Sequence, residues 1–315
     1  SQLGLSYLVY PGAQHTRFQH AIGSLHLMNK ALNQLENKGH KISKQEKEGV
    51  KIAILLHDIG HCPFSHALER TIVRDISHEQ LTLIYMHKLN EMFNGKLSLA
   101  IKIFENKYER KFLNQLVSSQ LDMDRLDYLK RDSFFTGVTE GNIGVDRIIS
   151  MLDIKDDRLV IEEKGIYSIE KFIIARRLMY WQVYLHKTVL SAENMLIQIL
   201  NRAKYLYENS KKIYLSPDLK RFFKNSFSFD DFIKDDSILE NFSRLDDYEI
   251  YACLKYWIKN EDFVLSNLSK KILDRNILKI RIQKTKFNKK IISKYRSNMM
   301  KKENINLNES KYFIF

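Results

Sequence analysis

Apolar residues recur every three or four positions through much of this chain, which is the period of a helix with one buried face. The pattern predicts helices over residues 17–37, 44–58, 78–93 and 99–118. From Ile169 to about Glu208 there is neither Gly nor Pro, and the same spacing predicts one long helix or two abutting ones. We therefore expect a mainly α fold.

The helix predicted over residues 44–58 has recognisable ends. Ser43 precedes a charged stretch and suits an N-cap, whereas Gly60 and Pro63 stop the helix. The apolar run before its end leads directly into His57-Asp58. Two adjacent side chains at a helix end point in different directions, so both reach one metal only if that end faces a cavity.

Short strands are expected in two places. Leu159–Ile161 follows the turn residues Asp156-Asp157 and is predicted to form a hairpin with Leu152–Ile154. Asn276–Gln283 carries several isoleucines and leucines and predicts a further strand. We expect a helical bundle around a metal site over residues 1–205, followed by an α+β region over 206–315.

Most of the formal net charge of +13 comes from one segment, residues 270–302, called here the basic segment. It holds thirteen Lys or Arg against the single acid Asp274. Such a stretch suits nucleotides, nucleic acid or an acidic partner, although a Lys-rich solvated tail gives the same pattern. No apolar run is long enough to span a bilayer. With only Cys62 and Cys253, no disulfide framework is implied and a cytoplasmic location is expected.

Nine of the ten histidines lie in the first 87 residues, and some of them form a metal-site pattern. The pair His57-Asp58 can give one metal an imidazole nitrogen and a carboxylate oxygen. His20 and Asp124 can complete a site that keeps positions open for water and substrate. This mixed set of ligands suits Mn, Fe, Mg or Zn and does not choose among them.

Further histidines follow the predicted ligands. His61 and His66 lie in the next turn, and His78-Glu79 opens the next helix. Histidine titrates near neutrality, and a carboxylate such as Glu69 or Glu79 can orient it, so these are candidates for proton transfer. One such histidine alone would more often be structural, but five in a short stretch beside an acidic pair favour function.

A second polar cluster runs from Asp124 to Asp132. On a helix, Asp124, Tyr128 and Asp132 share one face, and Arg125 flanks it. That face offers a metal ligand, a phenol, a carboxylate and a cation for phosphate, although a salt-bridged surface helix has similar residues. Arg17, one turn before His20, could reach a phosphate bound at the metal.

These motifs resemble a known family. His20, His57-Asp58 and Asp124 match the pattern that names the HD superfamily of metal-dependent phosphohydrolases. The stretches that further resemble its deoxynucleoside triphosphate triphosphohydrolase branch, which includes the mammalian sterile-alpha-motif/HD-domain enzyme, are Tyr10–His20, His57–His66, His78–Gln80 and Asp122–Asp132. The resemblance covers roughly residues 1–205.

The resemblance implies cleavage of a dNTP to a deoxynucleoside and inorganic triphosphate, with a divalent metal held by His20, His57, Asp58 and Asp124. The residues that would contact the phosphates and move protons are His61, His66 and His78, supported by Glu69 or Glu79. Those that would clamp the triphosphate are Arg17, Arg125, Tyr128 and Arg176.

The resemblance also implies which residues would bind the sugar and which would bind a regulatory nucleotide. Gln2 and Asp132 would hold the 3′-hydroxyl, and Leu3 and Tyr184 would crowd the 2′ position and select deoxyribose. The residues that would touch a regulatory nucleotide are Arg147, His186 and Lys187. Family members also suggest a homo-oligomer, a dimer or a tetramer.

Four positions depart from the mammalian branch. Arg125 stands for Lys, Glu69 for Asp, and Tyr180 and Phe134 for His. The chain starts at Ser1 without Met, so we expect a missing N-terminal segment. Two other functions stay open: an HD-type phosphodiesterase or nucleotidase acting on another nucleotide, and a nucleotide- or nucleic-acid-binding module with a vestigial site that uses the basic segment.

Overall fold

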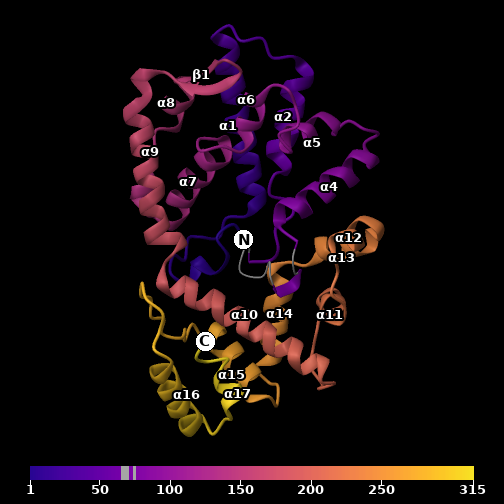
Figure 1. Ribbon diagram of the computed structural model, residues 1–315, viewed down its shortest axis with the longest axis vertical. Helices are drawn as coiled ribbons and strands as arrows, with labels where there is room; N and C mark the ends of the chain where they lie inside the picture. The colour runs from indigo at the N-terminus through magenta and orange to yellow at the C-terminus, as the bar shows by residue number, and fades with distance from the viewer. Residues whose placement is uncertain (65–70, 74–75) are drawn as a thin grey trace. The chain divides into compact units, whose positions relative to one another are not determined.

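A computed structural model gives the fold and describes residues 1–64, 71–73 and 76–315 (Figure 1). The described residues divide into two compact units. The first unit holds residues 1–64 and 76–185, and the second holds 186–315 together with 71–73. The domain boundary predicted at residue 205 lies close to the end of a helix of the second unit and stays a prediction.

The first unit consists of helices and one hairpin. Its elements are η1 (Gly4–Leu8), α1 (Arg17–Asn37), α2 (Lys44–Leu56), α4 (His78–Met92), α5 (Ser98–Phe104), α6 (Lys111–Val117), α7 (Met123–Thr136), η2 (Thr139–Gly141), α8 (Val145–Ser150), β1 (Leu152–Lys155), β2 (Arg158–Ile161), η3 (Glu163–Gly165), α9 (Ile166–Met179) and the π-helical turn η4 (Tyr180–Tyr184). Capping boxes at Thr16, Ser43 and Ser77 fix the starts of α1, α2 and α4.

Helices α1, α2 and α7 lie side by side in this unit, and each presents an apolar face to a common core. Met28 and Leu32 from α1, Val50 and Ile54 from α2, and Leu126 from α7 belong to that core. Burial of these side chains supplies the main driving force for packing. The polar ends of the same three helices therefore meet at one place.

Helices are the regular elements of the second unit over its described residues. Its elements are α10 (Lys187–Glu208), α11 (Pro217–Lys224), α12 (Phe229–Lys234), α13 (Asp236–Arg244), α14 (Asp247–Trp257), α15 (Phe263–Leu273), α16 (Lys289–Glu303) and α17 (Leu307–Ser310). α15 packs against both α10 and α14. Across the described chain, no helix is sufficiently long and apolar to cross a membrane.

The mainly α prediction and the predicted hairpin are confirmed. β1 and β2 pair antiparallel, with Leu152 opposite Ile161 and Lys155 opposite Arg158. The turn residues Asp156 and Asp157 have φ of 50° and 57°, the left-handed conformation that Asp tolerates in tight turns. The helices predicted over 17–37, 44–58 and 78–93 are present as α1, α2 and α4.

One predicted helix is interrupted, and for a longer predicted stretch the structure chooses two helices over one. The single helix predicted over 99–118 is wrong, because α5 ends at Phe104 and α6 begins at Lys111. Asn114 Nδ2 donates to the carbonyls of Ile103 and Phe104, at 2.9 and 3.2 Å, and so satisfies the end of α5. The stretch from Ile169 to Glu208 forms two helices, joined through η4.

The strand predicted over Asn276–Gln283 is wrong, and so is the α+β description of residues 206–315. The segment is irregular, and side chains of α10 contact its backbone at Leu278. Ser191 Oγ donates to the Leu278 carbonyl at 2.6 Å, and the Leu278 amide lies 3.2 Å from Met195 Sδ. An apolar run without a partner strand cannot build a ladder.

Candidate metal centre

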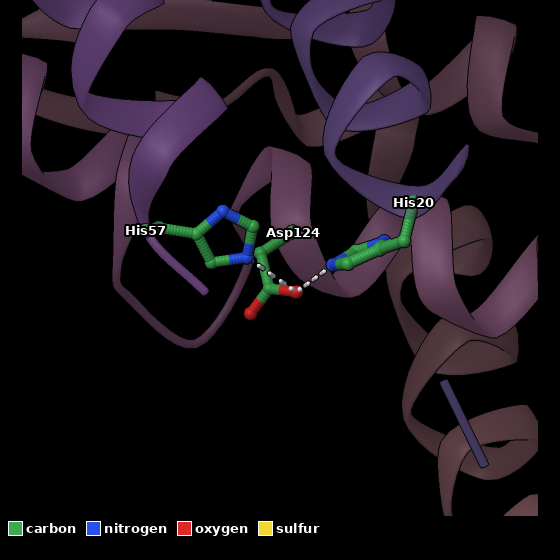
Figure 2. Close-up of side chains that lie close together, drawn as sticks. All are labelled: His20, His57 and Asp124. Carbon is green, nitrogen blue, oxygen red and sulfur yellow. Dashed lines mark hydrogen bonds and ion pairs between the residues drawn. The ribbon is translucent and has the colours of Figure 1, made fainter. Parts of the chain in front are cut away.

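Three of the predicted metal ligands converge in the first unit (Figure 2). His20 lies in the first turn of α1, His57 caps the end of α2, and Asp124 lies in the first turn of α7. One ligand atom from each lies within 4.8 Å of the others. Asp124 Oδ1 is 3.0 Å from His20 Nε2 and 3.5 Å from His57 Nε2.

The orientation of His57 fits a metal ligand. Its Nδ1 lies 2.6 Å from the Ile54 carbonyl, a contact in which Nδ1 is the donor and Nε2 is left as the acceptor. Among the described residues, the buried Nε2 has no hydrogen-bond partner. Two carboxylate oxygens, from Asp58 and Asp124, lie 3.5 Å from this nitrogen, and a cation between the three atoms would bind all of them. These residues therefore form a site for a divalent metal.

Asp58 lies at the edge of the same cluster. Its Oδ1 is 3.5 Å from His57 Nε2, and its Oδ2 is 3.9 Å from His20 Nε2. The Arg17 guanidinium pairs with Oδ2 and orients the carboxylate. The structure thus places the fourth predicted ligand, Asp58, beside the three that converge, and it places the predicted phosphate-binding Arg17 in contact with Asp58.

The predicted metal ligands shift one another's pKa values strongly, because imidazole and carboxylate groups of opposite charge lie close together. Burial lowers the pKa of His20, but the carboxylates of Asp124 and Asp127 outweigh it and raise that pKa to about 10. Burial also opposes protonation of His57, yet Asp58 and Asp124 hold its pKa above the usual value. The pKa values of Asp58 and Asp124 are lowered, because the neighbouring cationic groups outweigh the opposing effect of burial. A bound cation would replace those protons, so metal binding must release them.

Asp127, to which the sequence assigned no role, contacts the ring nitrogen of His20 that does not face Asp124. Asp127 Oδ2 is 2.8 Å from His20 Nδ1, and Arg131 donates to both Asp127 oxygens at 2.8 and 2.9 Å. Gly23 permits this approach, since a Cβ there would lie 2.0 Å from Asp127 Oδ1. The three-residue spacing from Asp124, one helical turn, was the available signal.

Two of the predicted proton-transfer histidines lie together. The rings of His61 and His78 are 4.1 Å apart between centroids, and His61 Nδ1 is 3.2 Å from the Asp58 carbonyl. His78 Nε2 lies 3.6 Å from Glu79 Oε1, whose side chain is largely exposed. The predicted proton-transfer residues His66 and Glu69 lie outside the described residues.

Close packing holds the end of α2, which precedes His61, against the start of α4, which carries His78. The Thr82 hydroxyl donates to the His57 carbonyl at 3.2 Å and accepts from the Gly60 amide at 3.1 Å. A Cβ on Gly60 would lie 2.3 Å from the His78 carbonyl oxygen. Glycine at this position therefore lets the start of α4 approach the end of α2.

The predicted sugar-binding residue Asp132 is buried and held on both oxygens. Tyr184 Oη donates to its Oδ2 at 2.7 Å, and His15 Nε2 lies 2.7 Å from its Oδ1. Burial and the nearby Asp132 raise the pKa of Tyr184 well above its usual value. His15, which also stacks on Phe135 with centroids 4.6 Å apart, was not predicted as a site residue.

Three arginines predicted to bind triphosphate share an unusual feature. The Nε atoms of Arg17, Arg125 and Arg176 are buried without a hydrogen-bond partner among the described residues. Arg125 pairs with Asp122, the N-cap of α7, and Arg176 lies 5.8 Å from the centre of the Tyr180 ring. Burial raises the pKa of Tyr128 to about 12, so this phenol stays protonated at neutral pH.

The remaining predicted site residues are more dispersed. The backbone amide of Gln2 donates to the His15 carbonyl at 3.0 Å, and Leu3 packs against the core of the first unit. Arg147 is exposed on α8, whereas His186 caps α10 and Lys187 is exposed beside it. The regulatory role of these last three residues stays a prediction.

Comparison with known proteins finds matches that include the residues of the metal centre. Residues 17–132 match the HD domain, and residues 143–215 match the HD-associated region. This chain is similar to the solved structure of a phosphohydrolase from Bacteroides thetaiotaomicron. The two sequences are 54% identical and the TM-score is 0.96, and the match covers 99% of this chain and 77% of that one. The chain belongs to the HD-domain phosphohydrolase family. The family resemblance seen in the sequence is thereby confirmed.

Two curated relatives of this HD-domain chain extend the comparison. An uncharacterised Bacillus subtilis protein is 32% identical over 88% of this chain, which spans 63% of that protein's length. A Dictyostelium discoideum homologue of the deoxynucleoside triphosphate triphosphohydrolase SAMHD1 is 28% identical over 67% of this chain and 45% of its own length. This chain thus spans less than two thirds of the length of either relative.

Proposed function

We propose that this HD-domain protein hydrolyses deoxynucleoside triphosphates to deoxynucleoside and inorganic triphosphate. The observation that carries the proposal is the face of α7, where the metal ligand Asp124, the phenol Tyr128 and the buried carboxylate Asp132 follow one another at intervals of one turn. A metal ligand and a hydroxyl-binding carboxylate on one rigid helix suit a phosphate and a sugar of the same substrate. The name of the Dictyostelium relative supports this substrate class.

The proposed roles follow from the charges of the site. His20, His57, Asp58 and Asp124 would hold a divalent cation, which would supply Lewis acidity to the hydrolysis. The guanidinium groups of Arg17, Arg125 and Arg176 neutralise the phosphate chain, and their unpartnered Nε atoms are donors that an anion would satisfy. Asp132, held by Tyr184 and His15, accepts from the sugar 3′-hydroxyl.

Proton transfer is assigned to the histidines beyond the metal ligands. His66 is our first choice as donor to the leaving oxygen, with Glu69 or another acid to support it. His61 and His78 contact each other beside Asp58 and can contribute to the same step. His66→Ala should therefore keep the metal and lose most turnover.

The test is product analysis. The purified protein is incubated with each dNTP and NTP in Mn or Mg, and the products are resolved by anion exchange. We expect deoxynucleoside and intact triphosphate from dNTPs, and none from the His57→Ala, Asp58→Ala double variant. Release of monophosphate or pyrophosphate, or no turnover even with mixed dNTPs as activators, would overturn the proposal and favour another HD-type substrate.

A second candidate function, nucleic-acid binding, is favoured by the exposure of the basic segment. α16 buries none of its side chains, and Arg281 lies over the Tyr295 ring at 5.3 Å from its centre. Exposed cations interleaved with Phe287 and Tyr295 suit single strands. Steeply salt-dependent binding of single-stranded DNA or RNA would support this role. The homo-oligomer and the cytoplasmic location stay predictions.

A further inference from the structure

The second unit contains a cavity of about 720 Å³ that belongs to no predicted site. Its lining comes from the segment after α10, which includes Lys211, Lys212 and Tyr214, and from the end of α14 and the following turn, which include Tyr256 and Lys259. Cavities of roughly 300–1,000 Å³ are the usual size for small-molecule ligands. This cavity is therefore large enough for a nucleotide.

Two tyrosines form an aromatic platform in its lining. The rings of Tyr214 and Tyr256 stack with centroids 3.9 Å apart and planes inclined by 23°. The Tyr256 side chain is nevertheless 59% exposed, so the stack leaves much of it open to solvent. The Trp257 indole donates to the Tyr214 carbonyl at 2.7 Å and fixes the platform to the core. A rigid ring with exposed surface is suited to stack on a nucleobase.

The lining is also basic. Over the described part of the chain, the ammonium groups of Lys211, Lys212 and Lys259 form no ion pair with an acidic side chain. Asp262 lines the cavity too, but the Arg202 guanidinium binds both of its oxygens, at 3.0 and 2.5 Å. Glu261 is the other acidic lining residue, so the balance of charge favours an anion.

Lys211 extends this basic surface further. It also lines an adjoining cavity of about 490 Å³, together with Lys224 of α11. Several lysines around an aromatic platform offer separate places for a base and for a chain of phosphates. Neither cavity includes any of the metal ligands.

We propose that the cavity beside Tyr214 and Tyr256 binds a nucleoside phosphate, with the base on the Tyr256 ring and the phosphates against Lys211, Lys212 and Lys259. This binding does not depend on the dNTP hydrolysis proposed above, because the residues belong to the second unit and use no metal ligand. The stacked ring provides the base contact and the lysines provide the charge contact, so each can be removed separately.

The test measures nucleotide binding in the His57→Ala, Asp58→Ala variant in the presence of EDTA. The probes are adenosine 5′-(β,γ-imido)triphosphate and inorganic triphosphate, titrated by calorimetry. We expect one nucleotide per chain, bound more tightly than inorganic triphosphate. Adding Tyr256→Ala should weaken nucleotide binding about tenfold or more and leave triphosphate binding unchanged. Adding Lys212→Glu with Lys259→Glu should weaken both probes.

Two controls keep the result interpretable. Tyr256→Phe keeps the aromatic ring and should bind as the parent does. Lys220→Glu reverses an exposed charge on α11 that lines neither cavity and should also leave binding unchanged. Unchanged affinity in a folded Tyr256→Ala variant, equal affinity for the two probes, or no binding at all would overturn the proposal. A failure of dNTP hydrolysis would not affect any of these readouts.

Discussion

Asp127 holds the imidazole of His20 through the ring nitrogen that does not face Asp124. Its Oδ2 is 2.8 Å from His20 Nδ1, while His20 Nε2 is 3.0 Å from Asp124 Oδ1. Arg131 in turn fixes both oxygens of Asp127. A carboxylate on the second nitrogen of a ligating histidine sets its tautomer and orientation, and raises its basicity as a ligand.

Asp127→Asn should therefore weaken metal binding without removing a ligand. We expect affinity for Mn to fall about 10- to 100-fold, as is usual when such a supporting carboxylate is lost. Calorimetric titration of the metal-free protein measures it. Asp153→Asn is a matched control, because Asp153 contacts His40 at 2.5 Å in a half-exposed pair outside the metal cluster. Equal metal affinity in the two variants would contradict the assignment.

His57→Ala should abolish both metal binding and hydrolysis. The buried Nε2 of His57 has no hydrogen-bond partner in the described part of the chain and lies 3.5 Å from Asp124 Oδ1, which suits a ligand of the same metal. Metal content after dialysis against Mn and activity on dNTPs are the two measurements. The control is His40→Ala, which removes a histidine outside the cluster. Retention of stoichiometric metal in His57→Ala would refute its role as a ligand.

Gly23→Ala should disturb the fold and the metal centre together. The added Cβ would lie 2.0 Å from Asp127 Oδ1 and 2.1 Å from an Arg131 guanidinium nitrogen, so the paired side chains of Asp127 and Arg131 must shift away from α1. Overpacking of this kind costs about 1–3 kcal/mol in the free energy of unfolding. Chemical denaturation measures the cost, with Gly144→Ala as control, because its nearest contact would be 3.7 Å. Equal stability of the two variants would show that the Asp127 and Arg131 side chains make room for the methyl group at no cost.

Tyr184→Phe should weaken the proposed binding site for the sugar 3′-hydroxyl. The variant leaves Oδ2 of the buried Asp132 without its donor, which costs about 1.5–3 kcal/mol for a charged acceptor. We expect a lower midpoint of thermal unfolding and a lower kcat/KM for dATP, whereas the ratio for dATP over ATP should stay the same, because both nucleotides carry the 3′-hydroxyl and the Phe ring still crowds the 2′ position. Tyr167→Phe, on the exposed face of α9, should change neither. An unchanged kcat/KM for dATP would show that the hydrogen bond from Tyr184 to Asp132 does not contribute to substrate binding.

Glu193→Gln should stabilise the protein at alkaline pH. Burial raises the pKa of Glu193 on α10 to about 7, above the value of about 4.3 expected in the unfolded chain. Ionisation in the folded state is therefore unfavourable, and its cost grows as pH rises from about 4.3 to about 7. We expect the variant to gain up to about 3 kcal/mol at pH 8 and little at pH 4. Urea unfolding at both values checks this, with Glu208→Gln at the exposed end of α10 as control.

Much of the local structure could be predicted from the sequence because it depends on neighbouring residues. The caps at Thr16, Ser43 and Ser77 and the apolar period between them specify α1, α2 and α4. The strand predicted over Asn276–Gln283 is absent, because strand formation depends on residues that are distant in the sequence. A strand needs a partner, and here side chains of α10 bind the backbone instead.

By itself, the sequence determined the helical character of the chain and the four predicted metal ligands, because helix periodicity and ligand types are properties of short stretches. Only the tertiary structure decided which side chains support those ligands. Asp127 reaches His20 across 107 positions of sequence, and His15 reaches Asp132 across 117. The tyrosine platform at Tyr214 and Tyr256 is also the product of packing. Such contacts form when apolar faces far apart in sequence are buried together, and no local pattern records which polar ends that burial brings into contact.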